Sequence, residues 1–154
     1  MVQIEARLQE LGIEIPDVPD AIANYVGAVR TGNLVFLSGR GPRKDGKFVH
    51  NGKLGKDVTV EEGYEAARLT ALNLLASLKS EVGDLDRVRR IVKLTGMVSS
   101  DPSFTDQPQV INGASDLLVE VFGDKGRHAR AAFGVAVLPM NTSVEIEMVV
   151  EIDL

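Results

Sequence analysis

Apolar and polar positions alternate most regularly near the end of the chain, over residues 144–152. The even positions of this segment are apolar: Val144, Ile146, Met148, Val150 and Ile152. Glu145 and Glu147 fall on the opposite face, and a period of two residues is typical of a β-strand. An unbroken apolar run precedes this segment over residues 131–138, and Pro139 ends the run. The pattern predicts two strands joined by a turn.

Apolar residues recur at helical spacing in three segments: residues 2–11, 60–82 and 108–122. The longest predicted helix has a capping box, with Thr59 as the N-cap and Glu62 three residues later. Gly83 is expected to end it. Pro108 suits the first turn of the third helix, and Gly123 is expected to end that helix.

Three further strands are predicted over residues 24–30, 34–38 and 88–98. The first two form a hairpin through the turn at Gly32. The polar segment 43–55 is predicted to be a loop that could hold a short strand at residues 47–49. Pro16 and Pro19 favour an extended crossing segment after the first helix.

This order of elements predicts an α+β fold, with helices on one face of a mixed sheet. The length of 154 residues fits a single domain over residues 1–154. Residues 1–20 would form an accessory N-terminal helix and crossing segment.

Composition excludes several classes of function. The chain has no cysteine and two histidines, which excludes thiolate chemistry and disfavours a multi-histidine metal site. The net charge of -5 is scattered, and no basic patch suggests a nucleic-acid partner. The N-terminus lacks the layout of a signal peptide, and no apolar run approaches the ~20 residues of a membrane span. A cytoplasmic protein without a membrane partner is therefore expected.

Arg130 is the leading candidate for chemistry, because a guanidinium binds a carboxylate through two parallel hydrogen bonds. The ordinary interpretation, which the residues alone favour, is an arginine at a strand end paired with a surface acid. Its predicted face also holds Ala132, Gly134 and Ala136, which are all small. Small side chains beside an arginine leave room either for a ligand or for a closely packed helix or subunit.

Other polar residues allow ordinary structural interpretations. Glu145 fits a solvated strand face, Tyr25 a half-buried aromatic ring, and Ser38 a hydroxyl at a strand end. Asn112 lies near the start of a helix, where an amide is common. His128 is interpreted as a solvated loop side chain.

Two sequence blocks together resemble a known family. Residues 130–147 read R-A-A-F-G-V-A-V-L-P-M-N-T-S-V-E-I-E, and residues 32–42 fit G-N-x-V-x-x-S-G-x-x-P after Tyr25. These blocks resemble the Rid (reactive intermediate deaminase) family, also called YjgF-like or L-PSP endoribonuclease-like. The resemblance covers residues 24–154. The additional N-terminal residues make the chain similar to the longer branch of that family.

The resemblance implies a chorismate-mutase-like α+β fold and a homotrimer with a central β-barrel-like core and ligand sites between subunits. It implies hydrolytic deamination of 2-imino acids or enamines to 2-keto acids and ammonia, without a metal or an organic cofactor. By position, Arg130 would hold the substrate carboxylate and Glu145 would activate water. The remaining pocket residues implied by the resemblance are Tyr25, Ser38, Asn112 and Ala132. The chain departs from the family pattern at Arg40 and His128, where glutamine and proline are usual.

A hairpin of the last two strands, centred near Asn141, would place Arg130 opposite Glu151. Arg130 would then lie about 20 Å from Glu145, so both could serve one site only across a subunit boundary. A non-catalytic binder of keto acids or other metabolites is the alternative function. RNA cleavage is disfavoured by the acidic composition.

Overall fold

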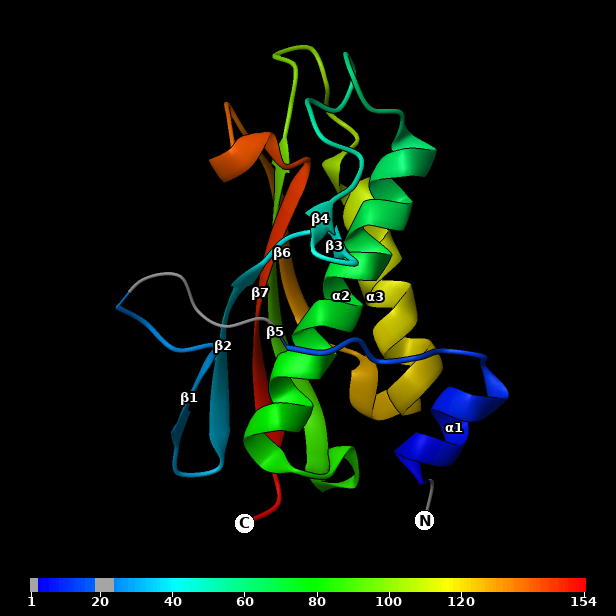
Figure 1. Ribbon diagram of the computed structural model, residues 1–154, viewed down its shortest axis with the longest axis vertical. Coiled ribbons are helices and arrows are strands. Elements are labelled where there is room, and N and C mark those ends of the chain that lie inside the picture. The colour runs from blue at the N-terminus through cyan, green and yellow to red at the C-terminus, as the bar shows by residue number, and fades with distance from the viewer. Residues whose placement is uncertain (1–2, 19–23) are drawn as a thin grey trace.

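The computed structural model is a five-stranded mixed β-sheet with two long helices packed on one side (Figure 1). It describes residues 3–18 and 24–154. The sheet has the strand order β1-β2-β7-β5-β6. Its strands are β1 (Ala28–Thr31), β2 (Leu34–Arg40), β5 (Val88–Ser99), β6 (Ala129–Val135) and β7 (Val144–Ile152). The predicted α+β class with two main helices on one face is confirmed, whereas the trimer and its barrel-like core stay predictions.

The helices are α1 (Ile4–Glu10), α2 (Val60–Val82) and α3 (Gln107–Phe122). Short 3₁₀ turns occur at η1 (Leu85–Arg87), η2 (Gly123–Gly126) and η3 (Pro139–Asn141). The capping box of α2 is confirmed, since the Thr59 hydroxyl accepts from the Glu62 amide and the Glu62 carboxylate accepts from the Thr59 amide. Gly83, with φ of 83°, ends α2 as predicted.

The two long helices pack unusually closely because α3 carries a glycine at their contact. A Cβ added at Gly113 would lie 2.0 Å from the Tyr64 carbonyl oxygen of α2. No side chain fits in that space, so Gly113 sets the separation of the helices.

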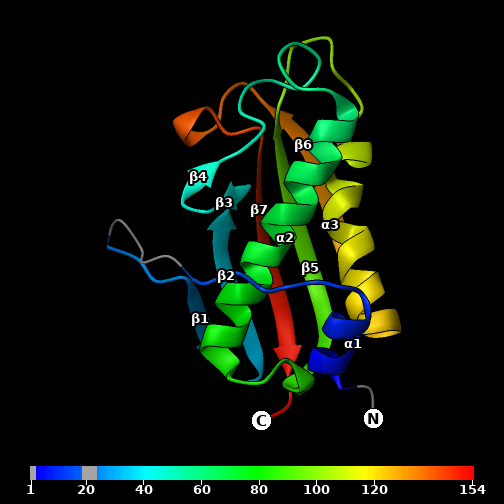
Figure 2. The same cartoon turned by 45° about the vertical axis from the view of Figure 1, so that its right-hand side comes forward.

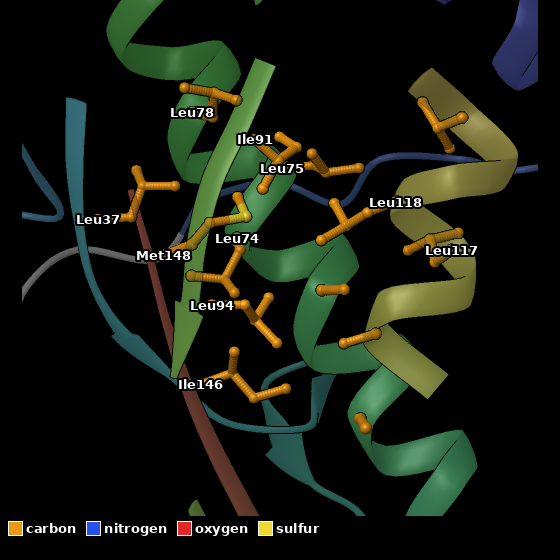
Figure 3. Packing of buried hydrophobic residues seen from close by; sticks show 14 of the residues in the cluster. Leu37, Leu74, Leu75, Leu78, Ile91, Leu94, Leu117, Leu118, Ile146 and Met148 are labelled. Atoms are coloured by element: carbon orange, nitrogen blue, oxygen red, sulfur yellow. The ribbon is translucent and has the colours of Figure 1, made fainter. Parts of the chain in front are cut away.

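The core lies between these helices and the sheet (Figure 3). Five alternate side chains of β7 are buried: Val144, Ile146, Met148, Val150 and Ile152. Met148 and Val150 lie beside Leu94 and Ile91 of β5, which are also fully buried. A strand with this much apolar surface is stable in the centre of the sheet, where both of its edges are paired.

The predicted hairpin of the last two strands is wrong. β6 pairs in parallel with β5, and β7 pairs antiparallel with both β2 and β5. Helix α3 supplies the crossover that two parallel neighbours require. Arg130 therefore lies beside Leu94 and not opposite Glu151.

Several predicted boundaries also change. The helix expected over residues 2–11 spans Ile4–Glu10, and Val2 and Pro19 lie outside the described residues. The strand expected over residues 24–30 is confined to Ala28–Thr31. β2 continues past Ser38 to Arg40, and Arg130 lies inside its strand and not before it.

The predicted loop 43–55 contains a small hairpin of β3 (Arg43–Lys44) and β4 (Lys47–Phe48). Residues 11–18 cross α2 after α1, as Figure 2 shows. Ile13 and Ile15 of this crossing segment pack against the core. Among the described residues, no helix is long and apolar enough to cross a membrane.

The second face of the sheet carries exposed apolar side chains. Val29 pairs across the strands with Phe36, and Phe133 pairs with Met97, which in turn pairs with Glu145. Val29, Phe36 and Phe133 are 55%, 45% and 43% exposed. We call this surface the open face of the sheet, as distinct from the helix-covered face.

Candidate functional site

Arg130 lies near the start of β6, and its side chain turns toward the helix-covered face. Its Nη1 donates to Asn112 Oδ1 at 2.8 Å and to Ser115 Oγ at 3.1 Å. Asn112 and Ser115 are three residues apart on α3, a spacing that places both side chains on one side of the helix. The structure therefore brings together Arg130 and Asn112, two of the residues predicted for the site.

Ser115 extends this contact to a residue whose sequence interpretation was wrong. His128 Nε2 lies 2.9 Å from Ser115 Oγ, and His128 Nδ1 lies 2.6 Å from the Gly126 carbonyl oxygen. His128 is thus half-buried and bonded at both ring nitrogens, not a solvated loop side chain. Burial lowers the pKa of His128, and the charge of Arg130 lowers it further, against the opposing effect of the Gly126 hydrogen bond.

The charge of Arg130 has no acidic partner within 4.0 Å among the described residues. Arg68, in contrast, makes an ion pair with Glu120 at 3.0 Å. Nη1 of Arg130 donates its two N–H groups to neutral oxygens. Over residues 3–18 and 24–154 the N–H groups of Nη2 and Nε have no acceptor, so they are available to bind another group. A half-buried guanidinium held in this way is suited to binding an anion.

Ala132 lies two residues after Arg130 on the same face and packs partly against the core. A Cβ added at Gly134 would lie 2.7 Å from Gln107 Nε2 of α3. Gly134 therefore leaves room for the end of the Gln107 side chain of α3.

Ser38 and Tyr25 lie at the other edge of the sheet. The Ser38 hydroxyl donates to the Val26 carbonyl at 2.6 Å, and the Ser38 amide donates to the Gly27 carbonyl at 2.9 Å. These bonds hold the segment that carries Tyr25, whose side chain is 51% exposed. A register shift in the pairing of β2 with β7 falls between Leu37 and Arg40.

Glu145 lies on the open face of β7, next to this irregularity. A Cβ added at Gly39 would lie 3.2 Å from the Glu145 carboxyl carbon, so Gly39 gives the carboxyl group its space. Burial raises the pKa of Glu145, and the nearby charge of Glu147 raises it further. The acid is therefore not the fully solvated side chain that the alternating pattern suggested.

The six predicted site residues form two groups on different faces of the sheet. Arg130, Asn112 and Ala132 belong to the helix-covered face, whereas Glu145 belongs to the open face beside the Ser38 segment. Arg130 and Glu145 are not brought together within one chain. The reason is the opposite orientation of their side chains, and not the hairpin distance expected from the sequence.

Arg40 points away from Glu145. Its Nε donates to Ser77 Oγ of α2 at 3.1 Å, and its Nη2 lies 2.9 Å from the position of a Cβ at Gly27. Its charge is thus placed on the helix-covered side. Among the residues that the structure describes, no group of three or more His, Asp or Glu side chains is arranged to hold a metal ion.

Ser115 is the site residue that the sequence prediction missed. The available signal was its spacing of three residues from Asn112 on a predicted helix. That spacing indicates a shared helix face but does not show which strand lies against it.

A family model described as "YjgF/chorismate_mutase-like, putative endoribonuclease" matches residues 5–152. The chain belongs to the YjgF-like family. The resemblance to Rid proteins found in the sequence is confirmed. The match begins within α1, so part of the accessory N-terminal segment falls inside the family model.

Relatives of this YjgF-like protein match over nearly the whole chain. Protein TCP17 of Trypanosoma cruzi is 46% identical over 152 residues, which are 98% of this chain and 95% of that protein. The crystal structure of Atu1372 from Agrobacterium tumefaciens, a protein of unknown function, is 49% identical with a TM-score of 0.90 and covers 98% of this chain and 92% of its own. A crystal structure from Shewanella oneidensis MR-1, described as a "putative endoribonuclease", is 38% identical in sequence with a TM-score of 0.95. The match covers 98% of this chain and 100% of that one.

Proposed function

We propose that this protein hydrolyses 2-imino acids, or their enamine tautomers, to 2-keto acids and ammonia. The observation that carries the proposal is Arg130, whose guanidinium is held by neutral oxygens and has no carboxylate within 4.0 Å among the described residues. The free edge of this group fits a substrate carboxylate through two parallel hydrogen bonds. Membership of the YjgF-like family supports the same assignment.

The proposed reaction converts R–C(=NH2+)–COO− and water into R–CO–COO− and NH4+. Water attacks the carbon of the C=N bond, and the resulting carbinolamine expels ammonia. Arg130 orients the substrate, and Glu145 takes a proton from the attacking water and returns it to the leaving nitrogen. A carboxyl group whose pKa is raised by burial is better matched to such transfers near neutral pH than a solvated one.

We further propose that each site is shared by two subunits of a homotrimer. Arg130, Asn112 and Ala132 come from one subunit, and Tyr25, Ser38 and Glu145 from the next. Two observations support this arrangement: the opposite faces of Arg130 and Glu145, and the exposed apolar side chains of the open face. A closed ring would bury that face and bring the two groups together at each boundary.

The test is release of ammonia from an imine generated in situ by an amino-acid oxidase. We expect the pure protein to accelerate this release and Arg130→Ala to lower kcat/KM by about 10²–10³-fold, as expected for a lost pair of charged hydrogen bonds. Arg68→Ala is the matched control, because Arg68 is paired with Glu120 on the helix surface. No acceleration by the wild type, or full activity of Arg130→Ala, would overturn the proposal.

Non-catalytic binding of a keto acid would use the same arginine, so a second variant separates the two functions. For an enzyme, Glu145→Gln lowers kcat by about 10²–10⁴-fold while the affinity for a keto acid such as 2-oxobutyrate is kept. If the wild type binds 2-oxobutyrate but does not hydrolyse an imine, the protein is a sensor and not an enzyme.

A further inference from the structure

A chain of hydrogen bonds continues from the anion-binding arginine into the protein. It runs from Arg130 Nη1 to Ser115 Oγ at 3.1 Å, from Ser115 Oγ to His128 Nε2 at 2.9 Å, and from His128 Nδ1 to the Gly126 carbonyl at 2.6 Å. Three elements contribute to it: β6, α3 and the turn η2. We call it the Arg130–Gly126 relay.

The chemistry of its last acceptor fixes the direction of every bond. A carbonyl oxygen has no proton, so His128 Nδ1 carries the hydrogen and donates it to Gly126. Burial lowers the pKa of His128, which favours the neutral ring, and its Nε2 is then an acceptor. Ser115 consequently donates its hydroxyl hydrogen to Nε2 and presents a lone pair to Arg130 Nη1.

The Gly126 carbonyl, which fixes this direction, is held by the packing of η2 against α3. A Cβ added at Gly126 would lie 2.2 Å from the Leu118 carbonyl oxygen, so the turn η2 is seated directly on α3. Other charges near the relay are engaged elsewhere, since Asp116 accepts from the Tyr64 hydroxyl and Asp124 pairs with Arg127 at 3.6 Å. Arg130 is the charged group that acts on the His128 ring.

We propose that His128, acting through Ser115, is a positioning residue for Arg130. Without an acceptor at His128 Nε2, the Ser115 hydroxyl hydrogen has no fixed direction and can turn toward the guanidinium. Asn112 would then hold Nη1 alone, and the plane of the guanidinium would no longer be fixed by two bonds. The relay thereby orients the free edge of Arg130 for the carboxylate, an inference that rests on the proposed function.

The test combines kinetics with binding of 2-oxobutyrate. Ser115→Ala and His128→Leu are each expected to raise KM and the Kd of 2-oxobutyrate about tenfold, with kcat changed less than about twofold. In the double variant, KM and the Kd of 2-oxobutyrate are expected to rise about tenfold and not about a hundredfold, because the two residues act in one relay. Ser115→Thr and His128→Gln keep a hydroxyl and an acceptor, and should restore KM to within about threefold of the wild type.

His50→Gln is the control, since the other histidine of the chain pairs with Glu62 and Glu65 on α2. Three results would overturn the relay while leaving the deaminase proposal intact. They are an unchanged KM in both Ser115→Ala and His128→Leu, a rise of KM in the double variant equal to the product of the two single rises, or a rise of KM in Ser115→Thr and His128→Gln as large as in Ser115→Ala and His128→Leu. A wild type that neither turns over an imine nor binds 2-oxobutyrate would overturn both.

A measurement on the wild type keeps the inference falsifiable if a variant does not fold. Nitrogen-15 spectra of the histidine rings are expected to show His128 as the Nδ1–H tautomer at neutral pH. An Nε2–H tautomer or an imidazolium at that pH would contradict the relay.

Discussion

Arg130 and Glu145 lie on opposite faces of the same β-sheet. Arg130 reaches α3 on the helix-covered face, where it bonds Asn112 and Ser115. Glu145 lies on the open face, in the space left by Gly39. Residues so placed act on one small molecule only if a second subunit brings its open face to the first. The proposed chemistry therefore requires the proposed assembly.

The open face is expected to be the assembly surface, and a charge placed on it should disrupt assembly. Phe133→Glu puts a carboxylate where an aromatic ring is 43% exposed in the single chain. Burying an unpaired charge in an interface costs several kcal/mol, so we expect the trimer to dissociate. Light scattering after size exclusion measures the mass. Leu154→Glu, at the 86% exposed chain end, should leave a trimer.

Stability should depend on pH through Glu145. Its pKa is raised in the folded protein, mainly by burial, so the native state binds this proton more tightly than the unfolded state does. The group therefore destabilises the fold progressively as pH rises above its unfolded pKa. Glu145→Gln should raise Tm at pH 7 and lose that advantage in acid, below the unfolded pKa.

Thermal unfolding of both proteins between pH 4 and pH 8 checks this expectation. The exposed neighbour Glu147 offers the matched variant, Glu147→Gln, which should give a smaller gain because it removes only the repulsion between the two acids. An equal Tm for Glu145→Gln and the wild type at pH 7 would refute the assignment of burial as the cause.

The packing of α2 on α3 should not tolerate a methyl group at position 113. Gly113→Ala would bring a Cβ to 2.0 Å from the Tyr64 carbonyl oxygen, which is backbone and cannot rotate away. We expect a loss of at least about 3 kcal/mol in the free energy of unfolding. Denaturant unfolding measures it, with the exposed Gln109→Ala on the same helix as the control. A loss below about 1 kcal/mol would show that the helices can separate easily.

Local patterns predicted the elements well, because they depend on neighbours in the sequence. The capping box at Thr59 identified the start of α2, and the period-two pattern of residues 144–152 identified β7 and its buried face. Strand pairing was not predictable in the same way. Whether β6 pairs with β7 or with β5 depends on α3, which provides the crossover for a parallel pair and covers one face.

The candidate site was likewise predictable only in part. Arg130 was identified from its place in a family motif and Asn112 by position from the family resemblance, and the structure places Arg130 Nη1 2.8 Å from Asn112 Oδ1. The contacts of Ser115 and His128 arise from the packing of η2 and α3 beside β6, for which the sequence carries no local signal. The orientation of Glu145 relative to Arg130 likewise follows from strand order, and strand order is a property of the whole sheet.

The most direct measurement is complementation between two inactive variants. Arg130→Ala and Glu145→Gln would be mixed in equal amounts, dissociated and reassembled, and then assayed for imine hydrolysis. If each site takes its arginine from one subunit and its glutamate from the next, about a quarter of the sites regain both groups, and about a quarter of wild-type activity should return. Mixed trimers that stay inactive, or a wild-type monomer that is fully active, would contradict a site shared between subunits.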